Sequence, residues 1–350
     1  MIYDVAIVGA GPAGSACAAH CAAGGLRTLL LDRAEFPREK VCGDCLNPAA
    51  WAVLERLGVE DAVRALPHAA LREVEFIATR GTPSRHPLPD GPRGEIGIRR
   101  RVLDDLLLHH AEQRGAEVRP GCAVERVEHR GDWALSVAGE TLHARHLVAA
   151  DGRNSTIARR LGLLPSAARD RVALQTRLPL SAETSARVVM RFLPWGYSGL
   201  ADIGAGEMNL CLVARPQHLD ALRAWAHAHF QPPTEAPWQS VTPLSRKAIH
   251  PVRGTLLFVG DAARVVEPFT GEGITYALAT GELAARALLS RDLRSYARTH
   301  ARLYRGRLWV NQLARAACLH PRLASALLQI GRAWPGVLGY LTKKVTGQPL

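Results

Sequence analysis

The chain opens with three glycines whose spacing can bring a backbone turn against a phosphate: Gly9, Gly11 and Gly14. An apolar run at residues 3–8 precedes this motif, and a run of small residues, 15–23, follows it. This order predicts a turn between a buried parallel strand and a helix whose N-terminal N–H groups attract an anion. A second apolar run ends at Asp32, a carboxylate that can accept hydrogen bonds from a ribose. The pattern therefore predicts a dinucleotide site, for either NAD or FAD.

Two later aspartates also follow short apolar runs, which places both at predicted strand ends. Asp151 follows residues 147–150 and precedes Gly152, while Asp261 follows residues 256–260. Carboxylate oxygens at such positions can accept hydrogen bonds from hydroxyl groups. The sequence holds no second Gly-x-Gly-x-x-Gly between a strand and a helix, so a separate nicotinamide domain is not expected.

In this order, the three motifs resemble those of the p-hydroxybenzoate-hydroxylase-like FAD enzymes. That superfamily includes aromatic hydroxylases, flavin halogenases and geranylgeranyl reductases, and the resemblance is closest to the geranylgeranyl reductase branch. It is carried by residues 36–44, 97–104 and 270–273, and it extends from residue 1 to about residue 300. The resemblance implies an α/β fold with a Rossmann-like FAD-binding domain of the glutathione-reductase type.

Non-covalent FAD is expected, because no His or Cys is assured next to a flavin edge, and the resemblance assigns roles to particular residues. Asp261 would bind the ribityl hydroxyls, and backbone N–H groups of residues 268–273 would face the N1–C2=O edge of the flavin. Arg100, four residues before Asp104, would contact the cofactor, and Asp151 would contact both FAD and NAD(P)H, the expected reductant. The predicted cofactor-binding residues are Gly9, Gly11, Ala13, Gly14, Asp32, Arg33, Arg100, Asp151, Gly260, Asp261, Gly271, Gly273 and Ile274.

Cys42 begins a Cys-Gly-Asp-Cys sequence that supports three interpretations. Its spacing to Cys45 is that of a redox dithiol. Alternatively, Cys42 resembles the flavin-proximal cysteine of the Cys-Gly-Gly motif in geranylgeranyl reductases, with Asp44 replacing the second glycine. Two inert thiols are the third reading. The predicted catalytic residues are Cys42, Phe269 and Gly271; the 14 histidines are scattered, so no metal site is predicted.

Alternating extended runs between residues 171 and 214 predict an antiparallel sheet inserted into the FAD-binding domain. We therefore expect a discontinuous FAD-binding domain, a substrate domain and a helical C-terminal tail. The tail is basic and amphipathic, and could either cover the FAD-binding domain or dock on a membrane surface. The expected boundaries are 1–72, 95–165 and 250–290 for the FAD-binding domain, 73–94 and 166–249 for the substrate domain, and 291–350 for the tail.

Three functions remain open at this stage. The favoured one is an NAD(P)H-using flavin monooxygenase that hydroxylates a small hydrophobic, aromatic or polyketide-like substrate through a flavin C4a-hydroperoxide. The first alternative is reduction of isoprenoid C=C bonds, as in geranylgeranyl reductases, although their aromatic-rich substrate motif is absent around residues 190–200. The second alternative is a maturase or accessory flavoprotein that oxidises a residue of a partner protein. Flavin halogenases use a lysine near the first third of the chain. Halogenation is disfavoured here because no lysine lies between Lys40 and Lys247.

Composition limits the remaining classes of function. The net charge of +12 comes with no basic run or aromatic platform, so nucleic acid is not an expected partner. No stretch of 18 apolar residues predicts a spanning helix, and an acidic residue, Asp4, stands where a signal peptide needs basic ones. We expect a cytoplasmic protein with reduced thiols, or one peripheral to the inner face of a membrane.

Overall fold

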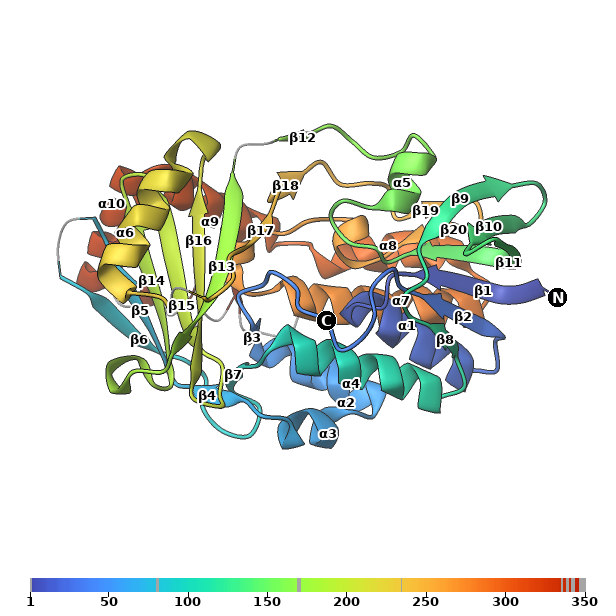
Figure 1. The fold of residues 1–350 in the computed structure, drawn as a ribbon, viewed down its shortest axis with the longest axis horizontal. Helices are drawn as coiled ribbons and strands as arrows, with labels where there is room; N and C mark the ends of the chain where they lie inside the picture. The colour runs from blue at the N-terminus through green and yellow to red at the C-terminus, as the bar shows by residue number, and fades with distance from the viewer. Residues whose placement is uncertain are drawn as a thin grey trace.

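A parallel sheet assembled from distant parts of the chain forms the first lobe of the molecule, at the right of Figure 1. The computed structural model describes residues 2–79, 82–168, 171–233, 235–334, 336–337, 340 and 344–345. The sheet order is β19-β20-β11-β1-β2-β8, and β1 pairs in parallel with both β2 and β11. Its strands are β1 (Ile2–Val8), β2 (Thr28–Leu31), β8 (Glu117–Arg119), β11 (Glu140–Ala149), β19 (Val252–Arg253) and β20 (Leu256–Phe258).

Helices and a short meander cover this sheet and form the nucleotide lobe with it. Helix α1 (Pro12–Ala23) packs along α7 (Gly273–Leu289), and α4 (Arg100–Gln113) packs beside α1. The meander strands β9 (Val124–His129) and β10 (Trp133–Val137) extend the sheet antiparallel from β11. The fold class expected from the sequence, a Rossmann-like parallel sheet with helices, is confirmed.

A seven-stranded sheet forms the second lobe, at the left of Figure 1. Its order is β17-β13-β16-β15-β14-β5-β6, antiparallel except where β5 joins β14 in parallel. The parallel pair unites the two chain segments expected to form the substrate domain. Its strands are β5 (Glu73–Ile77), β6 (Ser84–Pro87), β13 (Val172–Pro179), β14 (Arg187–Leu193), β15 (Gly196–Asp202), β16 (Glu207–Ala214) and β17 (Gln239–Val241).

Helices cover the two faces of the seven-stranded sheet. On one face, α6 (Leu219–Phe230) buries Leu222 and Ala226 against β16. On the other face, α9 (Leu308–Leu319) contacts β15 and α10 (Pro321–Ala333) contacts β14.

The tail therefore covers more than the nucleotide lobe. Helix α8 (Leu293–Leu303) packs on α7 in that lobe, α9 contacts both the turn at residues 268–270 and the other sheet, and α10 packs on the other sheet. Part of the tail predicted at 291–350, after residue 334, lies outside the described residues. Within the described residues, no helix is long and apolar enough to cross a membrane.

A small three-stranded sheet connects the two lobes. Strand β7 (Glu95–Gly97) lies between β3 (Cys45–Leu46) and β4 (Ala69–Leu71), and pairs antiparallel with both. A Cβ added to Gly97 would stand 1.8 Å from the carbonyl oxygen of Asp202 in the seven-stranded sheet. This close approach holds the end of β7 against the second lobe. The remaining elements are α2 (Trp51–Leu57), α3 (Glu60–Ala65), α5 (Thr156–Arg160), β12 (Ala167–Ala168) and β18 (Ser245–Arg246).

The contact between α1 and α7 yields a test of how the nucleotide lobe packs. A Cβ on Gly281 of α7 would stand 2.3 Å from the carbonyl oxygen of Ala13 in α1. We expect Gly281→Val to lower the free energy of unfolding by about 3 kcal/mol, because it overfills this interface. Gly273→Ala, at the start of the same helix and with no atom within 4 Å, should change it by less than about 0.5 kcal/mol. Urea unfolding of the two apoprotein variants measures both; equal losses would contradict the packing argument.

Candidate cofactor and substrate site

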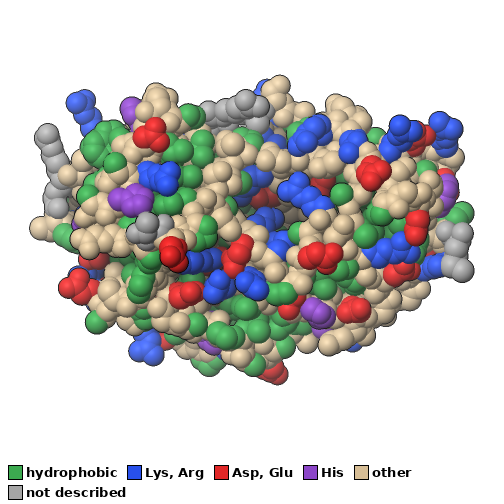
Figure 2. Space-filling model, viewed as in Figure 1, with side chains coloured by type: hydrophobic (Ala, Val, Ile, Leu, Met, Phe, Trp, Pro, Cys, Tyr) green, Lys and Arg blue, Asp and Glu red, His purple; other side chains and the backbone are tan. Residues whose placement is uncertain are grey.

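One cavity of about 400 Å³ runs from the glycine turn, between the two lobes, to the tail helices. Figure 2 shows basic side chains where this face of the molecule is hollowed between the lobes. The walls are basic and polar near the glycine turn, and apolar beside the seven-stranded sheet and α9. Representative lining residues are Gly11, Arg100 and Asp261 from the nucleotide lobe, Met190 and Phe192 from the sheet, and Ala314 from α9.

The three positions of the first motif require glycine for different structural reasons. A Cβ on Gly9, where φ is +105°, would stand 2.5 Å from the carbonyl oxygen of Ala150, and one on Gly14 would stand 1.8 Å from that of Gly9. A Cβ on Gly11 would instead meet only guanidinium nitrogens, of Arg38 at 3.8 Å and Arg100 at 3.9 Å. Gly9 and Gly14 are therefore required by the packing of the lobe, whereas Gly11 keeps open a space that faces two positive charges.

Arg100 is fixed in this position by a buried carboxylate. Its Nε and Nη2 donate to the two oxygens of Asp104, at 2.7 and 2.8 Å, and both side chains are buried. Arg38 Nη1 lies 3.0 Å from the same carboxylate. Arg38 Nη2 also lies 3.9 Å from Asp32 Oδ2, so these carboxylates hold two guanidinium groups beside Gly11 and the N-terminus of α1. The positive charge of these groups suits a pyrophosphate.

Asp32 and Arg33 lie outside the lining of the cavity. Both carboxylate oxygens of Asp32 accept backbone hydrogen bonds, from the Ala10 N–H at 2.7 Å and the Ala34 N–H at 2.9 Å. Asp32 therefore holds the glycine turn to the end of β2, and its role at a ribose stays a prediction. Arg33 is exposed, so the structure adds no evidence for its predicted contact.

Asp261 and Arg153 form a polar stretch of the cavity wall. Arg153 Nη2 donates to Asp261 Oδ2 at 3.3 Å, while Arg153 Nη1 is buried without a hydrogen-bond partner in the part of the chain that the structure describes. Asp151 does not line the cavity; its Oδ2 accepts the Ile157 N–H at 3.0 Å at the start of α5. Asp261 can therefore accept hydrogen bonds from hydroxyl groups in the cavity. Asp151 instead accepts a hydrogen bond from the backbone at the start of α5.

Residues 268–273 form a turn that ends at the first residue of α7. A 3₁₀ helix, Pro268–Thr270, is followed by Gly271 with φ +68°, and the first N–H groups of α7 point out of the helix. Gly271, Gly273 and Ile274 all line the cavity. The predicted arrangement, backbone amides facing a flavin edge, fits this geometry.

Two contacts from distant elements hold that turn. Asn311 of α9 accepts the Glu267 N–H at 2.9 Å, and its Nδ2 donates to Glu272 at 3.0 Å. The carboxylate of Glu267 forms a buried, bidentate ion pair with Arg171 at 2.8 and 2.9 Å. The tail and the residue just before β13 therefore both position the turn, which no local sequence signal predicts.

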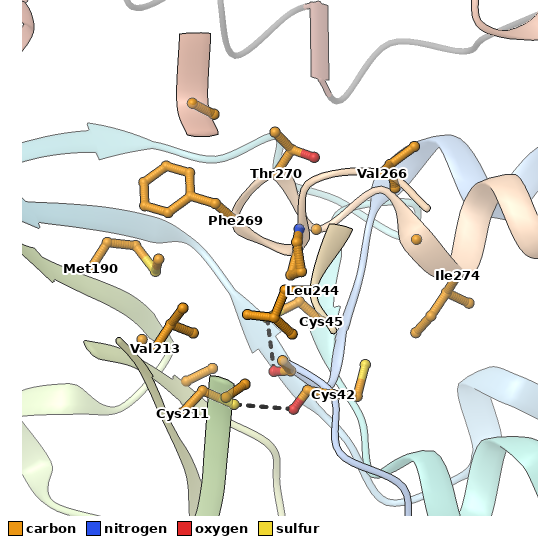
Figure 3. Close-up of a pocket in the computed structure, with 18 of the residues that line it drawn as sticks. Cys42, Cys45, Met190, Cys211, Val213, Leu244, Val266, Phe269, Thr270 and Ile274 are labelled. Atoms are coloured by element: carbon orange, nitrogen blue, oxygen red, sulfur yellow. Dashed lines mark hydrogen bonds between the residues drawn. The ribbon is translucent and has the colours of Figure 1, made fainter. Parts of the chain in front are cut away.

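Phe269 extends from this turn into the second lobe. Its ring centroid lies 5.5 Å from those of Phe192 and Tyr197 and 6.3 Å from that of Phe76. In Figure 3 the ring points toward the side of the cavity where Met190 lies. Phe269 thus connects the turn with the apolar wall, and its catalytic role remains a prediction.

Three thiols line the cavity near the turn: Cys42, Cys45 and Cys211 (Figure 3). None is in a disulfide. Asn209 Nδ2 and Cys211 Sγ donate to the Cys42 carbonyl oxygen at 2.7 and 3.3 Å, so the seven-stranded sheet holds the Cys42 backbone. Burial raises the pKa of the Cys45 thiol well above its usual value, which disfavours the thiolate that a redox dithiol needs. Cys42 lines the cavity, and its place beside the flavin stays a prediction.

Asp44 is a residue whose importance the sequence did not indicate. It is fully buried with φ +55°, a backbone conformation that favours glycine, and its carboxylate is bonded to Arg177, Gln175 and the Arg100 N–H. Burial raises its pKa from 3.8 to about 6, although Arg177 opposes the shift. The aspartate in place of a glycine is thus compensated by an arginine from β13, 133 residues away.

Gly11→Val separates cofactor binding from folding. The added side chain meets only flexible guanidinium ends, so the apoprotein should melt within about 2 °C of wild type, a change of under about 0.5 kcal/mol. FAD affinity should fall at least about 100-fold, equivalent to about 2.8 kcal/mol, because the space for the pyrophosphate is filled. Fluorescence titration of the apoprotein with FAD measures this. Gly14→Val should instead fail to fold; unchanged FAD affinity in Gly11→Val would contradict the assignment.

Arg177→Leu tests the ion pair that compensates Asp44. Removing one partner of a buried pair should lower the free energy of unfolding by about 3 kcal/mol at pH 7.5. The loss should be smaller at pH 5, because the Asp44 pKa is already raised to about 6 and the carboxyl can then bind a proton. Adding Asp44→Gly should recover most of the loss, since glycine accepts the positive φ. Urea unfolding at both pH values measures these differences, and a double variant no more stable than the single one would refute the compensation.

Comparison with known proteins agrees with this site. The family model of an FAD binding domain matches residues 2–187. A menaquinone reductase of Mycobacterium tuberculosis is 34% identical in an alignment of 348 positions that covers 89% of this chain and 79% of that protein. Digeranylgeranylglycerophospholipid reductase 2 of Methanopyrus kandleri is 30% identical over 331 positions, covering 83% and 79%. The solved flavin-dependent brominase Bmp2 superposes with a TM-score of 0.79 at 20% identity, over 99% of this chain and 94% of that one.

The brominase similarity shows the fold, and the two reductases are relatives over most of their own length. The family match covers more than half of the chain and includes the glycine turn and Arg100. The open space at Gly11, the guanidinium groups beside it and the available Asp261 carboxylate fit FAD. The chain therefore belongs to the FAD-binding-domain family of FAD-dependent oxidoreductases.

Proposed function

We propose that this protein is an FAD-dependent reductase that saturates a C=C bond in the polyprenyl chain of a lipid, with a prenylated quinone as the favoured substrate class. The two relatives described above are named for menaquinone and for a digeranylgeranyl lipid, and both molecules carry polyprenyl chains. The sequence alone ranked hydroxylation of an aromatic substrate first. The reductase alternative is now preferred, because the hydroxylase and halogenase resemblance extends only to the fold.

The apolar half of the cavity is the observation that carries this proposal. From the turn at residues 268–273, the cavity continues between the seven-stranded sheet and the tail helices. A polyprenyl chain offers methyl and alkene groups with no hydrogen-bonding atoms, so its burial needs such walls. The apolar lining residues here are Val188, Met190, Phe192, Tyr197, Leu313 and Leu327.

The chain's own residues would bind and orient both molecules. Gly11, Arg38 and Arg100 would hold the pyrophosphate of FAD, and Asp261 its ribityl hydroxyls. Bound FAD, once reduced by NAD(P)H or another donor, supplies the hydride that alkene reduction requires. The amides at Gly271 and Gly273 would stabilise negative charge on the pyrimidine edge of the flavin. Phe269 and its aromatic neighbours would exclude water from the space beside that edge.

Chemically reduced holoenzyme tests the proposal without knowledge of the natural electron donor. We expect it to convert menaquinone in detergent micelles anaerobically into a product heavier by two hydrogens in the prenyl chain, measured by mass spectrometry. Menadione, which lacks the prenyl chain, should give no such product. An oxygenated product formed only with labelled O₂ would favour the monooxygenase instead.

A variant of α9 tests whether the apolar half of the cavity holds the substrate. Ala314 lines the cavity, whereas Ala316 on the same helix does not. Ala314→Trp should therefore lower kcat/KM for menaquinone by about tenfold, about 1.4 kcal/mol, and Ala316→Trp should leave it near wild type. Equal effects of the two variants would mean that the chain binds elsewhere.

A further inference from the structure

One carboxyl group in the cavity has no role in the site described so far. Glu95 begins β7, the central strand of the small sheet between the lobes, and its side chain lines the cavity. A Cβ on Gly271 would stand 4.0 Å from Glu95 Oε1. Because Gly271 lies in the turn predicted to face the flavin, this carboxyl is directed at the place where cofactor and substrate would meet.

The carboxyl of Glu95 is unpaired. No hydrogen bond or ion pair of its side chain is present among the described residues, whereas nearby Asp44, Asp261 and Glu267 each bind an arginine. The titratable groups on the elements beside it are the thiols of Cys45 on β3 and Cys42 on the preceding loop, and the Asp44 carboxyl on that loop, which is bonded to Arg177. The partner strand β4, Ala69–Leu71, and the turn at 268–271 carry no charged side chain.

This setting favours the protonated acid. Burial among uncharged groups raises the pKa of Glu95 from 4.5 to about 7, and no cation opposes the shift. Near neutral pH the group can therefore hold a proton and release it. A general acid works best when its pKa lies close to the working pH.

We propose that Glu95 is the proton donor in the reduction of the substrate C=C bond, an inference that rests on the proposed function. One alkene carbon receives a hydride, with its electron pair, from the reduced flavin. The other carbon receives the proton of the Glu95 carboxyl: its O–H bond breaks, a C–H bond forms and the π bond is consumed. The resulting carboxylate then takes a proton from water, so one substrate C=C and one reduced flavin give one saturated bond and one oxidised flavin.

The experiment compares wild type with Glu95→Gln, which keeps the size of the side chain but cannot donate an acidic proton. Glu125→Gln, an exposed site on β9, is the matched control. Each holoenzyme is reduced anaerobically with dithionite and mixed with menaquinone in micelles, and flavin reoxidation is followed by absorbance. We expect Glu95→Gln to slow this step at least about 100-fold at pH 6. The wild-type rate should fall as the pH rises through about 7, and the residual Glu95→Gln rate should not.

Two further measurements separate proton donation from a structural role. The midpoint potential of the bound flavin should be the same in wild type and Glu95→Gln; a changed potential with a normal reoxidation rate would overturn the proposal. In the apoprotein, the native state binds the Glu95 proton more tightly than the unfolded state does. This contribution to stability is present below pH 4.5 and is lost as the pH rises through 7. Wild type should therefore gain melting temperature relative to Glu95→Gln as the pH is lowered from 8 to 5.

The outcomes distinguish this inference from the function on which it rests. If wild type forms the saturated product and Glu95→Gln forms it at the same rate, only the proton-donor assignment fails. If wild type forms no saturated product, the proposed function fails and the assignment fails with it. Slow reoxidation in Glu95→Gln, together with an unchanged flavin potential and the expected difference in melting temperature, supports both.

Discussion

The close approach of β1, α1 and α7 is the constraint on which the rest of the structure depends. Gly14 lies against the carbonyl of Gly9, Gly9 lies against Ala150 at the end of β11, and Gly281 lies against Ala13. At each of these points a side chain would collide with backbone, which cannot move aside as a flexible side chain can. These contacts fix where α1 begins, and so where its N-terminal amides can receive a pyrophosphate.

The same arrangement determines where the second half of the site can form. Helix α7 packs along α1, so its first residue, Gly273, is held near the glycine turn. The preceding turn is then clamped from outside the lobe, by Asn311 of α9 and by the ion pair of Glu267 with Arg171. The basic region beside the glycine turn and the apolar region beside the seven-stranded sheet consequently share one cavity, and the turn lines it between them.

Asp44 and Glu95, two carboxyl groups at the junction of the lobes, differ in whether they have a partner. Asp44 adopts a glycine-like backbone and is neutralised by Arg177, so its charge supports the junction between β13 and the cysteine loop. Glu95, on the neighbouring strand, is left without a partner and faces the cavity. Glu95 is half-buried, and a carboxyl with a raised pKa in a cavity is found most often at a functional site.

The sequence by itself determined the elements that depend on local patterns. The glycine spacing, the apolar runs and the alternation of residues 171–214 correctly predicted the parallel sheet, the inserted sheet and the helix that follows the glycine motif. These signals are local because the side chains on the buried face of a strand or helix recur at a fixed spacing along the sequence. The glycine spacing identified Gly11, the family resemblance identified Arg100, Asp261 and Gly271, and the structure brings all four to one cavity.

Only the tertiary structure decided which side chains meet across long distances. It placed α9 and α10 on the seven-stranded sheet, where the sequence had allowed a cover for the nucleotide lobe, and it paired Asp44 with Arg177. It also separated Gly11, which faces ligand space, from Gly9 and Gly14, which face backbone. Neither Glu95 nor Asn311 carries a local signal, because the environment of each is built by other elements of the chain, such as the turn at residues 268–271 beside Glu95 and Glu267 beside Asn311. Burial, pairing and pKa are properties of that environment, and a one-dimensional pattern does not contain them.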